Sequence, residues 1–131
     1  MSDAAIEQEI IAKGLTAPRV TPANIEDNIA SEHYFTAADG VGRASKGESS
    51  VSGKNPEALG LLTFCVLVLR NGFTVTGESA CASPENFDAA LGQKIARANA
   101  VNKMWPLMGY ELKQRLHDAA LKDAAEIRCE G

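Results

Sequence analysis

The residue types that could support binding chemistry gather in one stretch with a helical pattern, residues 89–110. This stretch holds three cations and no acid, in a chain whose formal net charge is -4. A local positive surface suits a small anionic ligand, and Asn99 and Asn102 add hydrogen-bonding amides. The stretch is also typical of a solvated helix face beside a packing seam of small residues, so both interpretations stay open. The three cations are Lys94, Arg97 and Lys103. The small residues are Gly92, Ala96 and Ala100.

A second candidate pair is Arg70 and Phe73, which flank the dipeptide Asn71-Gly72. A guanidinium over an aromatic ring stabilises a hairpin end by roughly 0.5–1 kcal/mol without any function. A cation beside an aromatic ring is also what a purine with an attached phosphate requires. The residue types alone do not decide between these two interpretations.

A Gly- and Ser-rich segment, residues 39–55, invites comparison with phosphate-binding loops but has the wrong spacing. Five residues separate Gly47 from Gly53 where a phosphate loop needs four, and Asn55 stands where Ser or Thr would hold magnesium. We expect a surface loop here, either a flap over a site or a tolerated insertion.

Metal and covalent chemistry find little support in the sequence. The two histidines, His33 and His117, are not at ligand spacing. Cys81 beside Ser83 could be a nucleophile near a helix start, but the sequence indicates no base beside it. We therefore expect no metal, no cofactor and no catalytic residue. The three scattered cysteines include no CxxC pair, which favours a reducing cytoplasm.

Composition limits the partners that this chain can have. A hydrophobic share of 45% with 23% charged residues is typical of a folded globular protein. The acidic total argues against binding to nucleic acid. The longest apolar run, residues 59–69, is too short to span a bilayer, so no membrane partner is expected. The first residues have neither the basic start nor the apolar stretch of a signal peptide.

The strongest structural pattern is a β-hairpin over residues 61–80. Residues 61–69 are apolar on both faces, as in a central strand that is covered on both sides. Asn71-Gly72 suits a type I′ turn, and residues 73–78 alternate as a half-exposed partner strand. The expected cross-strand pairs, all on one face, are Arg70 with Phe73, Val68 with Val75 and Val66 with Gly77.

Helical patterns lie on both sides of this hairpin. Thr21-Pro22 opens a helix that is expected to end near His33, before a short strand at residues 34–37. Ser83-Pro84 opens a second helix, which Pro106 interrupts, predicting a kink or a helical hairpin. The buried stripe of this second helix is expected to hold Phe87, Leu91, Ile95, Ala98, Asn102 and Trp105.

These patterns predict an α+β fold, with a small antiparallel β-sheet, an N-terminal helix and a C-terminal helical hairpin. We divide the chain into an N-terminal arm over residues 1–20, a single domain over residues 21–124 and a C-terminal tail over residues 125–131. Apolar and small residues are in excess on the C-terminal helices. A chain of 131 residues would struggle to bury them alone, which favours a homo-oligomer.

Five stretches of the sequence carry a resemblance to known proteins: Tyr34–Gly40, Gly60–Cys81, Ser83–Asp88, Lys94–Arg97 and Ala100–Tyr110. They resemble a family of small tailed-phage proteins, and the resemblance extends from about Thr21 to Leu116. That family includes the first type of Thoeris anti-defence protein. Its members bind and sequester the cyclic ADP-ribose isomers that bacterial TIR-domain proteins make on infection.

The resemblance implies a phage or prophage protein that acts in the cytoplasm of the infected bacterial host. It would bind and sequester cyclic nucleotide immune signals, either cyclic ADP-ribose isomers or cyclic oligonucleotides, without catalysis. It would form a homo-oligomer, a dimer at least and a hexamer built from dimers. The alternative is a phage protein–protein interaction module that acts on a host protein and needs no nucleotide.

In such a protein the ligand is expected to lie where two subunits meet. The residues expected to bind it are Lys94, Arg97 and Lys103 for phosphate, Asn99 for ribose or base, Phe73 with Arg70 for the purine, and Arg115 from the neighbouring chain.

Overall fold

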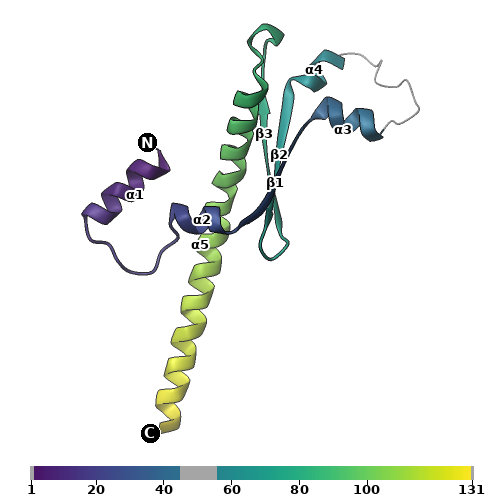
Figure 1. Cartoon of the computed structure of the whole chain (residues 1–131). Coiled ribbons are helices and arrows are strands. Elements are labelled where there is room, and N and C mark those ends of the chain that lie inside the picture. The colour runs from purple at the N-terminus through teal and green to yellow at the C-terminus, as the bar shows by residue number, and fades with distance from the viewer. Residues whose placement is uncertain (1, 45–55, 131) are drawn as a thin grey trace. The chain divides into compact units, whose positions relative to one another are not determined.

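The computed structural model of the chain describes residues 2–44 and 56–130 (Figure 1). Its internal contacts group the described chain into two compact units. One unit is Asn28–Lys103, and the other combines the residues up to Asp27 with those from Met104 onward. The architecture is mixed α+β, with an N-terminal helix, a three-stranded antiparallel sheet and a long C-terminal helix. The predicted fold class is therefore confirmed.

The unit Asn28–Lys103 is built on the antiparallel sheet (Figure 1). Its strands are β1 (Ile29–Thr36), β2 (Leu62–Leu69) and β3 (Thr74–Ala80), in the order β1-β2-β3. β2 is thus the central strand, as its continuous apolar run predicts. Residues along β2 alternate between a buried and a half-buried face. The buried face carries Thr63, Cys65, Leu67 and Leu69.

The hairpin between β2 and β3 is present, but the predicted register is wrong by one residue. The observed pairs include Leu67 with Val75 and Cys65 with Gly77. Because successive side chains point to opposite faces of a strand, this shift puts Val75 and Gly77 on the same face as Leu67 and Cys65, which is the buried one, instead of the face of Val66 and Val68. It replaces the predicted pairs, which were Arg70 with Phe73, Val68 with Val75 and Val66 with Gly77.

The length of the turn explains the shift. The Leu69 N–H donates to the Phe73 carbonyl oxygen at 2.8 Å, and the Gly72 N–H donates to the Leu69 carbonyl oxygen at 2.9 Å. Three residues, Arg70 to Gly72, therefore form the loop, and Gly72 closes it in the left-handed region with φ 89°. Three-residue hairpin loops commonly end in a left-handed glycine. Asn71-Gly72 thus predicted the hairpin but not its loop length.

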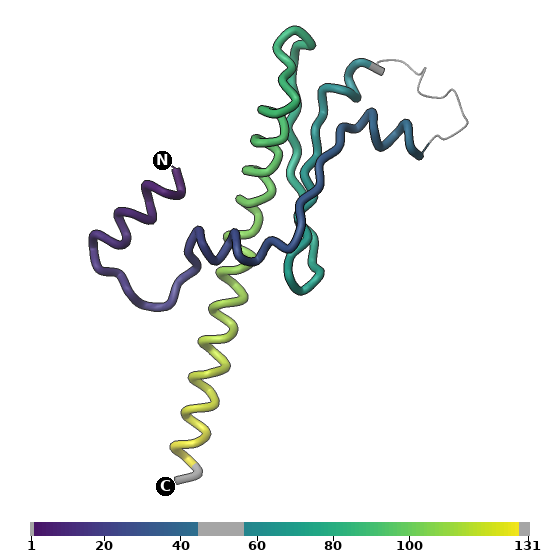
Figure 2. The backbone as a smooth tube through the Cα atoms, viewed as in Figure 1, coloured from purple at the N-terminus to yellow at the C-terminus, as the bar shows by residue number. Residues whose placement is uncertain are grey.

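The first turns of helix α5 (Ala89–Glu130) run beside the sheet (Figure 2). They pack on β2 and β3 through small residues. Gly92, Ala96 and Ala100 are buried, whereas Leu91 and Ile95 are 53% and 44% exposed. The predicted stripe of large apolar residues is therefore wrong. The seam of small residues, which the sequence offered as an alternative, is the packing surface.

Gly77 of β3 shows why the packing seam needs small residues. An ideal Cβ on Gly77 would lie 2.1 Å from the Ala96 carbonyl oxygen and 2.3 Å from the Ala100 nitrogen. The backbones of α5 and β3 therefore approach so closely that only glycine fits at this point. Large side chains on this face of α5 would hold the helix away from the sheet.

α5 begins later than predicted. Ser83-Pro84 opens only a short 3-10 turn, Pro84–Asn86, and the Ser83 side chain makes no capping hydrogen bond. The cap of α5 is Asp88 instead, whose Oδ1 accepts the Leu91 N–H at 3.1 Å. A short side-chain acceptor at this position satisfies one of the free N–H groups of the first turn.

α5 is also a single helix rather than the predicted helical hairpin. It has 42 residues with Pro106 inside, and it continues past residue 125, where the predicted tail begins, to Glu130. A proline removes one backbone donor and disfavours helix in the residue before it, but a helix can resume beyond it. Among residues 2–44 and 56–130, no helix is long and apolar enough to cross a membrane.

Helices α1 (Asp3–Ala12) and α2 (Pro22–Asp27) belong to the other unit. Thr21 caps α2 as predicted, because its Oγ1 accepts the Asn24 N–H at 3.1 Å. α2 nevertheless stops well before His33, where the sequence pattern placed its end. The residues after it pair with the apolar strand β2 and form β1, so sheet pairing overrides their helical spacing.

Part of the predicted Gly- and Ser-rich loop is helical. α3 (Ala37–Ala44) follows β1 directly and includes residues 39–44 of the predicted loop, and α4 (Pro56–Gly60), which comes just after that loop, leads into β2. Thr36 and Asp39 cap α3 reciprocally: the Thr36 N–H donates to Asp39 Oδ2 at 2.9 Å, and the Asp39 N–H donates to Thr36 Oγ1 at 3.1 Å. The rest of the segment, residues 45–55, lies outside the described residues, and so does the flap predicted there.

Candidate functional site

Arg97 lies at one flank of the packing seam of α5. Its neighbours Ala96 and Ala100 are fully buried, which fixes this part of the helix on the sheet. From there the Arg97 guanidinium pairs with Glu32 of β1, and Nε lies 2.9 Å from Oε2. The two side chains remain 28% and 42% exposed. The residue predicted to face phosphate is therefore a partly exposed cation on a well-packed support.

Two titratable groups lie beside this ion pair. The Tyr34 hydroxyl donates to Glu32 Oε1 at 3.3 Å, and Tyr34 is opposite Cys65 in the sheet register. Burial is the main cause that raises the pKa of Tyr34 to about 12. The negative charge that Cys65 carries once its thiol ionises at high pH, and the charge of Glu32, add to the rise in pKa. Burial also raises the pKa of the Cys65 thiol. Both groups are neutral near pH 7, so Arg97 and Glu32 carry the charge of this cluster.

Asn99 lies on the other flank of the packing seam. Its Nδ2 donates to the carbonyl oxygen of Glu78 in β3 at 2.8 Å. Arg97 therefore reaches toward β1 and Asn99 toward β3, with the α5 backbone between them. Within one chain, the structure does not bring these two predicted ligand-binding residues together.

Phe73 shares a sheet face with the Arg97–Glu32 pair. The Phe73 carbonyl oxygen accepts a hydrogen bond from the N–H of Leu69, so Phe73 is opposite Leu69, whose side chain is on the buried face. The Phe73 ring is nevertheless 54% exposed. Glu32 is paired with Leu67, two residues back along β2. About 7 Å along the strands and about 10 Å across them separate the two positions, because β2 lies between β1 and the Phe73 side of the hairpin. Phe73 and Arg97 are thus on the same face of the sheet, the one that α5 covers, but toward opposite edges of it.

The other predicted ligand-binding residues are exposed cations. Lys94 and Lys103 are exposed on α5, and Arg70 is exposed in the hairpin loop. Arg115 belongs to the other unit, where its Nε lies 2.6 Å from Glu111 Oε1, one helical turn earlier. The prediction that Arg115 contributes from a neighbouring chain stays a prediction.

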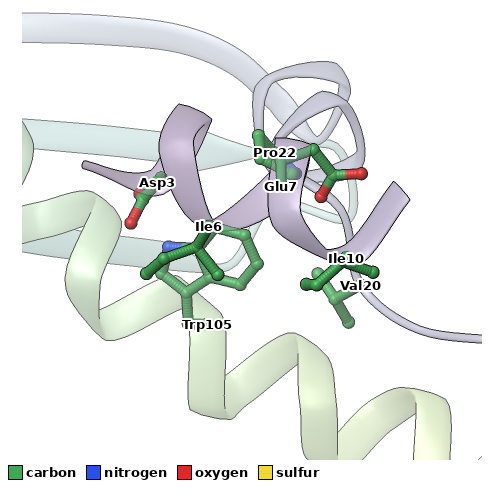
Figure 3. Close-up of a pocket in the computed structure, with 7 residues that line it drawn as sticks. All are labelled: Asp3, Ile6, Glu7, Ile10, Val20, Pro22 and Trp105. Carbon is green, nitrogen blue, oxygen red and sulfur yellow. The ribbon is translucent and has the colours of Figure 1, made fainter. Parts of the chain in front are cut away.

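The unit formed by the chain up to Asp27 and from Met104 onward contains an apolar cavity of about 200 Å³ (Figure 3). In the close-up, Ile6 lies over the ring of Trp105. Trp105 Nε1 is buried and has no hydrogen-bond partner among the described residues. The cavity is lined by Asp3, Ile6, Glu7, Ile10, Val20, Pro22 and Trp105. Sequence reasoning missed it because α1 has only a weak apolar pattern.

Glu7, one of the residues that line this cavity, forms an ion pair with Arg19. The Arg19 guanidinium donates two hydrogen bonds to Glu7, from Nη1 to Oε2 at 2.7 Å and from Nη2 to Oε1 at 2.5 Å. The hydrogen bond from Arg19 lowers the pKa of Glu7, and the same bond raises the pKa of Arg19. Such a bidentate pair is geometrically specific. It ties α1 to the segment that leads into α2.

The residues considered for covalent or metal chemistry have simple local partners. The Cys81 thiol donates to the Ser83 carbonyl oxygen at 3.1 Å. His33 Nε2 lies 3.0 Å from the Ser31 hydroxyl. Within residues 2–44 and 56–130, no group of three or more His, Cys, Asp or Glu side chains is placed to hold a metal ion.

Comparison with known proteins gives one family match. Residues 20–116 match the model of a family described as "Phage protein (N4 Gp49/phage Sf6 gene 66) family". The matched range contains the sheet, the packing seam of α5 and the Arg97–Glu32 pair. No curated protein and no solved structure matches the chain.

Proposed function

The chain belongs to the N4 Gp49/phage Sf6 gene 66 family of phage proteins, and on that premise we propose that it binds and sequesters a cyclic nucleotide immune signal of the infected bacterium. The ligand class is a cyclic ADP-ribose isomer, with cyclic oligonucleotides as the second choice. The protein holds its ligand without converting it, in the host cytoplasm. The sequence resemblance to Thoeris anti-defence proteins supports this ligand class.

The observation that carries the proposal is the Arg97–Glu32 pair. An ion pair with both partners partly exposed contributes only about 0–1 kcal/mol. A charge-assisted hydrogen bond to a phosphate contributes about 1.5–3 kcal/mol. Arg97 can therefore exchange Glu32 for a pyrophosphate at a net gain. Because Ala96 and Ala100 are already packed, the exchange needs no movement of the helix.

Phe73 supports the purine end of the same ligand. Its exposed ring lies on the sheet face of the Arg97–Glu32 pair, and stacking of a base on an aromatic ring contributes about 1–3 kcal/mol. Lys94 and Lys103 add positive charge on α5, and Arg70 adds it beside the ring. In the proposed complex, Asn99 and Arg115 reach the ligand from a second subunit, so the site is complete only in a homo-oligomer.

Calorimetry with a cyclic ADP-ribose isomer tests this site. Arg97→Ala should weaken binding about tenfold to a hundredfold through the lost charge-assisted bond, and Phe73→Ala should weaken it comparably through lost stacking. Arg43→Ala is the matched control, since Arg43 is an exposed arginine at the end of α3 and should leave binding unchanged. Unchanged affinity in both Arg97→Ala and Phe73→Ala would remove this site.

A specific observation favours the alternative, a protein–protein interaction module. Leu91 and Ile95 are more than 40% exposed on α5, and Phe35 and Phe64 stack on the half-buried sheet face with ring centroids 5.3 Å apart. Mass spectrometry of small molecules released from protein purified out of TIR-expressing cells separates the two functions. A stoichiometric nucleotide supports sequestration. If the protein binds no cyclic nucleotide, the sequestration proposal is wrong and the protein–protein interaction module becomes the proposed function.

A further inference from the structure

The cavity beside Trp105 is large enough for a ring-shaped molecule. Its volume is about 200 Å³, and it belongs to the unit that combines the residues up to Asp27 with those from Met104 onward. An apolar cavity of about 150 Å³ can stay dry and bind benzene. Five of the lining residues here are apolar: Ile6, Ile10, Val20, Pro22 and Trp105. Burial of an apolar ring against them is therefore favourable.

Trp105 adds a buried hydrogen-bond donor to this apolar lining. Its Nε1 is buried, and no atom of the described residues accepts its hydrogen. A buried N–H without a partner costs free energy, which an acceptor would recover. A buried water typically makes about three hydrogen bonds, and most of this lining is apolar. An acceptor carried by an apolar ligand would satisfy the N–H and keep the apolar contacts.

The two acids of the lining, Asp3 and Glu7, select the charge of the ligand. Arg19 donates to both carboxylate oxygens of Glu7, so this ion pair contributes little net charge. Asp3 is an exposed acid in the first turn of α1. Because like charges repel, Asp3 disfavours an anionic ligand. The lining therefore suits a neutral molecule.

We propose that this cavity binds a small neutral aromatic molecule with one hydrogen-bond acceptor, which accepts from Trp105 Nε1. In Figure 3, Ile6 lies over the Trp105 ring, so the ligand meets an apolar wall from α1 and an aromatic wall from α5. A flat ring packs favourably against an indole in an offset or edge-to-face arrangement. The Arg97–Glu32 pair belongs to the other unit, and this inference does not depend on the proposed cyclic nucleotide.

Three compounds of nearly the same shape test the donor and the charge separately. Acetophenone is neutral and has a carbonyl acceptor, α-methylstyrene has a carbon in place of the carbonyl oxygen, and benzoate has a carboxylate. Trp105 is the single tryptophan of the chain, so its indole N–H gives one resonance of its kind in a nitrogen–proton NMR spectrum. Acetophenone should shift that resonance with a Kd of about 0.1–1 mM, as expected for a ligand of its size.

The other two compounds should bind more weakly. The affinity of α-methylstyrene should be about tenfold lower, because it leaves the Trp105 N–H unsatisfied, and that of benzoate about tenfold lower or more, because of Asp3. Trp105→Phe removes the donor and keeps an aromatic wall. In this variant, ligand-detected NMR should give affinities for acetophenone and α-methylstyrene within about twofold of each other.

A matched pair of variants on α1 tests the apolar wall. Ile6→Ala should weaken acetophenone binding about threefold to tenfold. Ile11→Ala makes the same change at an exposed isoleucine outside the cavity and should leave binding unchanged. No binding of acetophenone at about ten times the expected Kd overturns the proposal, and so do equal affinities for acetophenone and α-methylstyrene in the parent. An indole resonance that moves with protein concentration, and not with acetophenone, would mean that a second copy fills the cavity and that the proposal is wrong.

Discussion

Two segments of α5 meet their surroundings in opposite ways. Residues 89–103 turn small residues toward the sheet and bury them, while large ones such as Leu91 and Ile95 stay exposed. Residues 111–128 bury almost nothing and expose large apolar and alternating charged side chains. The difference shows that apolar content does not identify the packed face of this helix. In the first segment, the close approach of the α5 and β3 backbones decides which residues face the sheet. In the second segment, nearly every side chain is exposed, whatever its type.

The largest expected effect comes from adding a side chain where the backbones of α5 and β3 approach each other. Gly77→Ala places a methyl group 2.1 Å from a carbonyl oxygen of α5, so α5 and β3 must separate. We expect a loss of about 3 kcal/mol in the free energy of unfolding, the upper end of overpacking effects, measured by urea denaturation. Gly109→Ala, in the second half of α5 where an added Cβ would meet nothing within 4 Å, should instead raise stability by about 0.5–1 kcal/mol. Equal effects at both glycines would contradict the close approach.

A smaller effect is expected from the ion pair at the flank of the packing seam. Glu32→Gln removes the carboxylate that competes with a phosphate for Arg97, so the affinity for a cyclic ADP-ribose isomer should rise about two- to fivefold. Glu57→Gln, an exposed acid in α4, serves as the control in the same calorimetric titration. A fall in affinity with Glu32→Gln would mean that Glu32 itself binds the ligand.

The smallest effect distinguishes the two tyrosines, one in the sheet and one on the second half of α5. Tyr34 keeps its proton in the folded state up to about pH 12, whereas the unfolded chain loses it near pH 10. Its contribution to stability is therefore complete below pH 10 and is lost as the pH rises toward 12.

Thermal unfolding between pH 9 and pH 11.5 measures this loss. Tyr34→Phe should make stability less sensitive to pH in that window, because the group that titrates differently is gone. Tyr110→Phe, which removes the hydroxyl of an exposed tyrosine, is the matched control. The raised pKa of Cys65 acts in the same direction and remains in both variants. The same pH dependence in Tyr34→Phe and the parent would refute the assignment.

The sequence predicted the elements that depend on local pattern. The apolar run of β2 indicated a central strand, Thr21 indicated the start of α2, and the small residues of α5 were identified as a packing seam. The hairpin register escaped prediction because the same Asn71-Gly72 dipeptide fits loops of two or three residues. That single residue decides which side chains of β2 share a face with Val75 and Gly77.

Other elements could not be predicted from the sequence because they depend on tertiary contacts. Residues 29–33 of β1 were predicted as the end of the first helix, and only pairing with β2 makes them a strand, whereas residues 34–36 belong to the short strand that was predicted. For the candidate site, Arg97 and Phe73 were identified by type, but the partner of Arg97 was not. Glu32 is 65 residues away in the chain, and no local pattern connects the two. The cavity beside Trp105 likewise depends on where α1 packs.

The two connections of the sheet differ greatly in length, and this sets an order of assembly. β2 and β3 are joined by a three-residue loop, whereas Thr36 of β1 pairs with Thr63 of β2 across a long intervening segment. A hairpin closes in about 1–10 μs, while the entropy cost of closing a loop grows with its length. β1 should therefore join last, carrying Glu32 to Arg97. In stopped-flow refolding, Val75→Ala should slow folding, whereas Glu32→Gln should chiefly speed unfolding; the reverse pattern would show that β1 docks first.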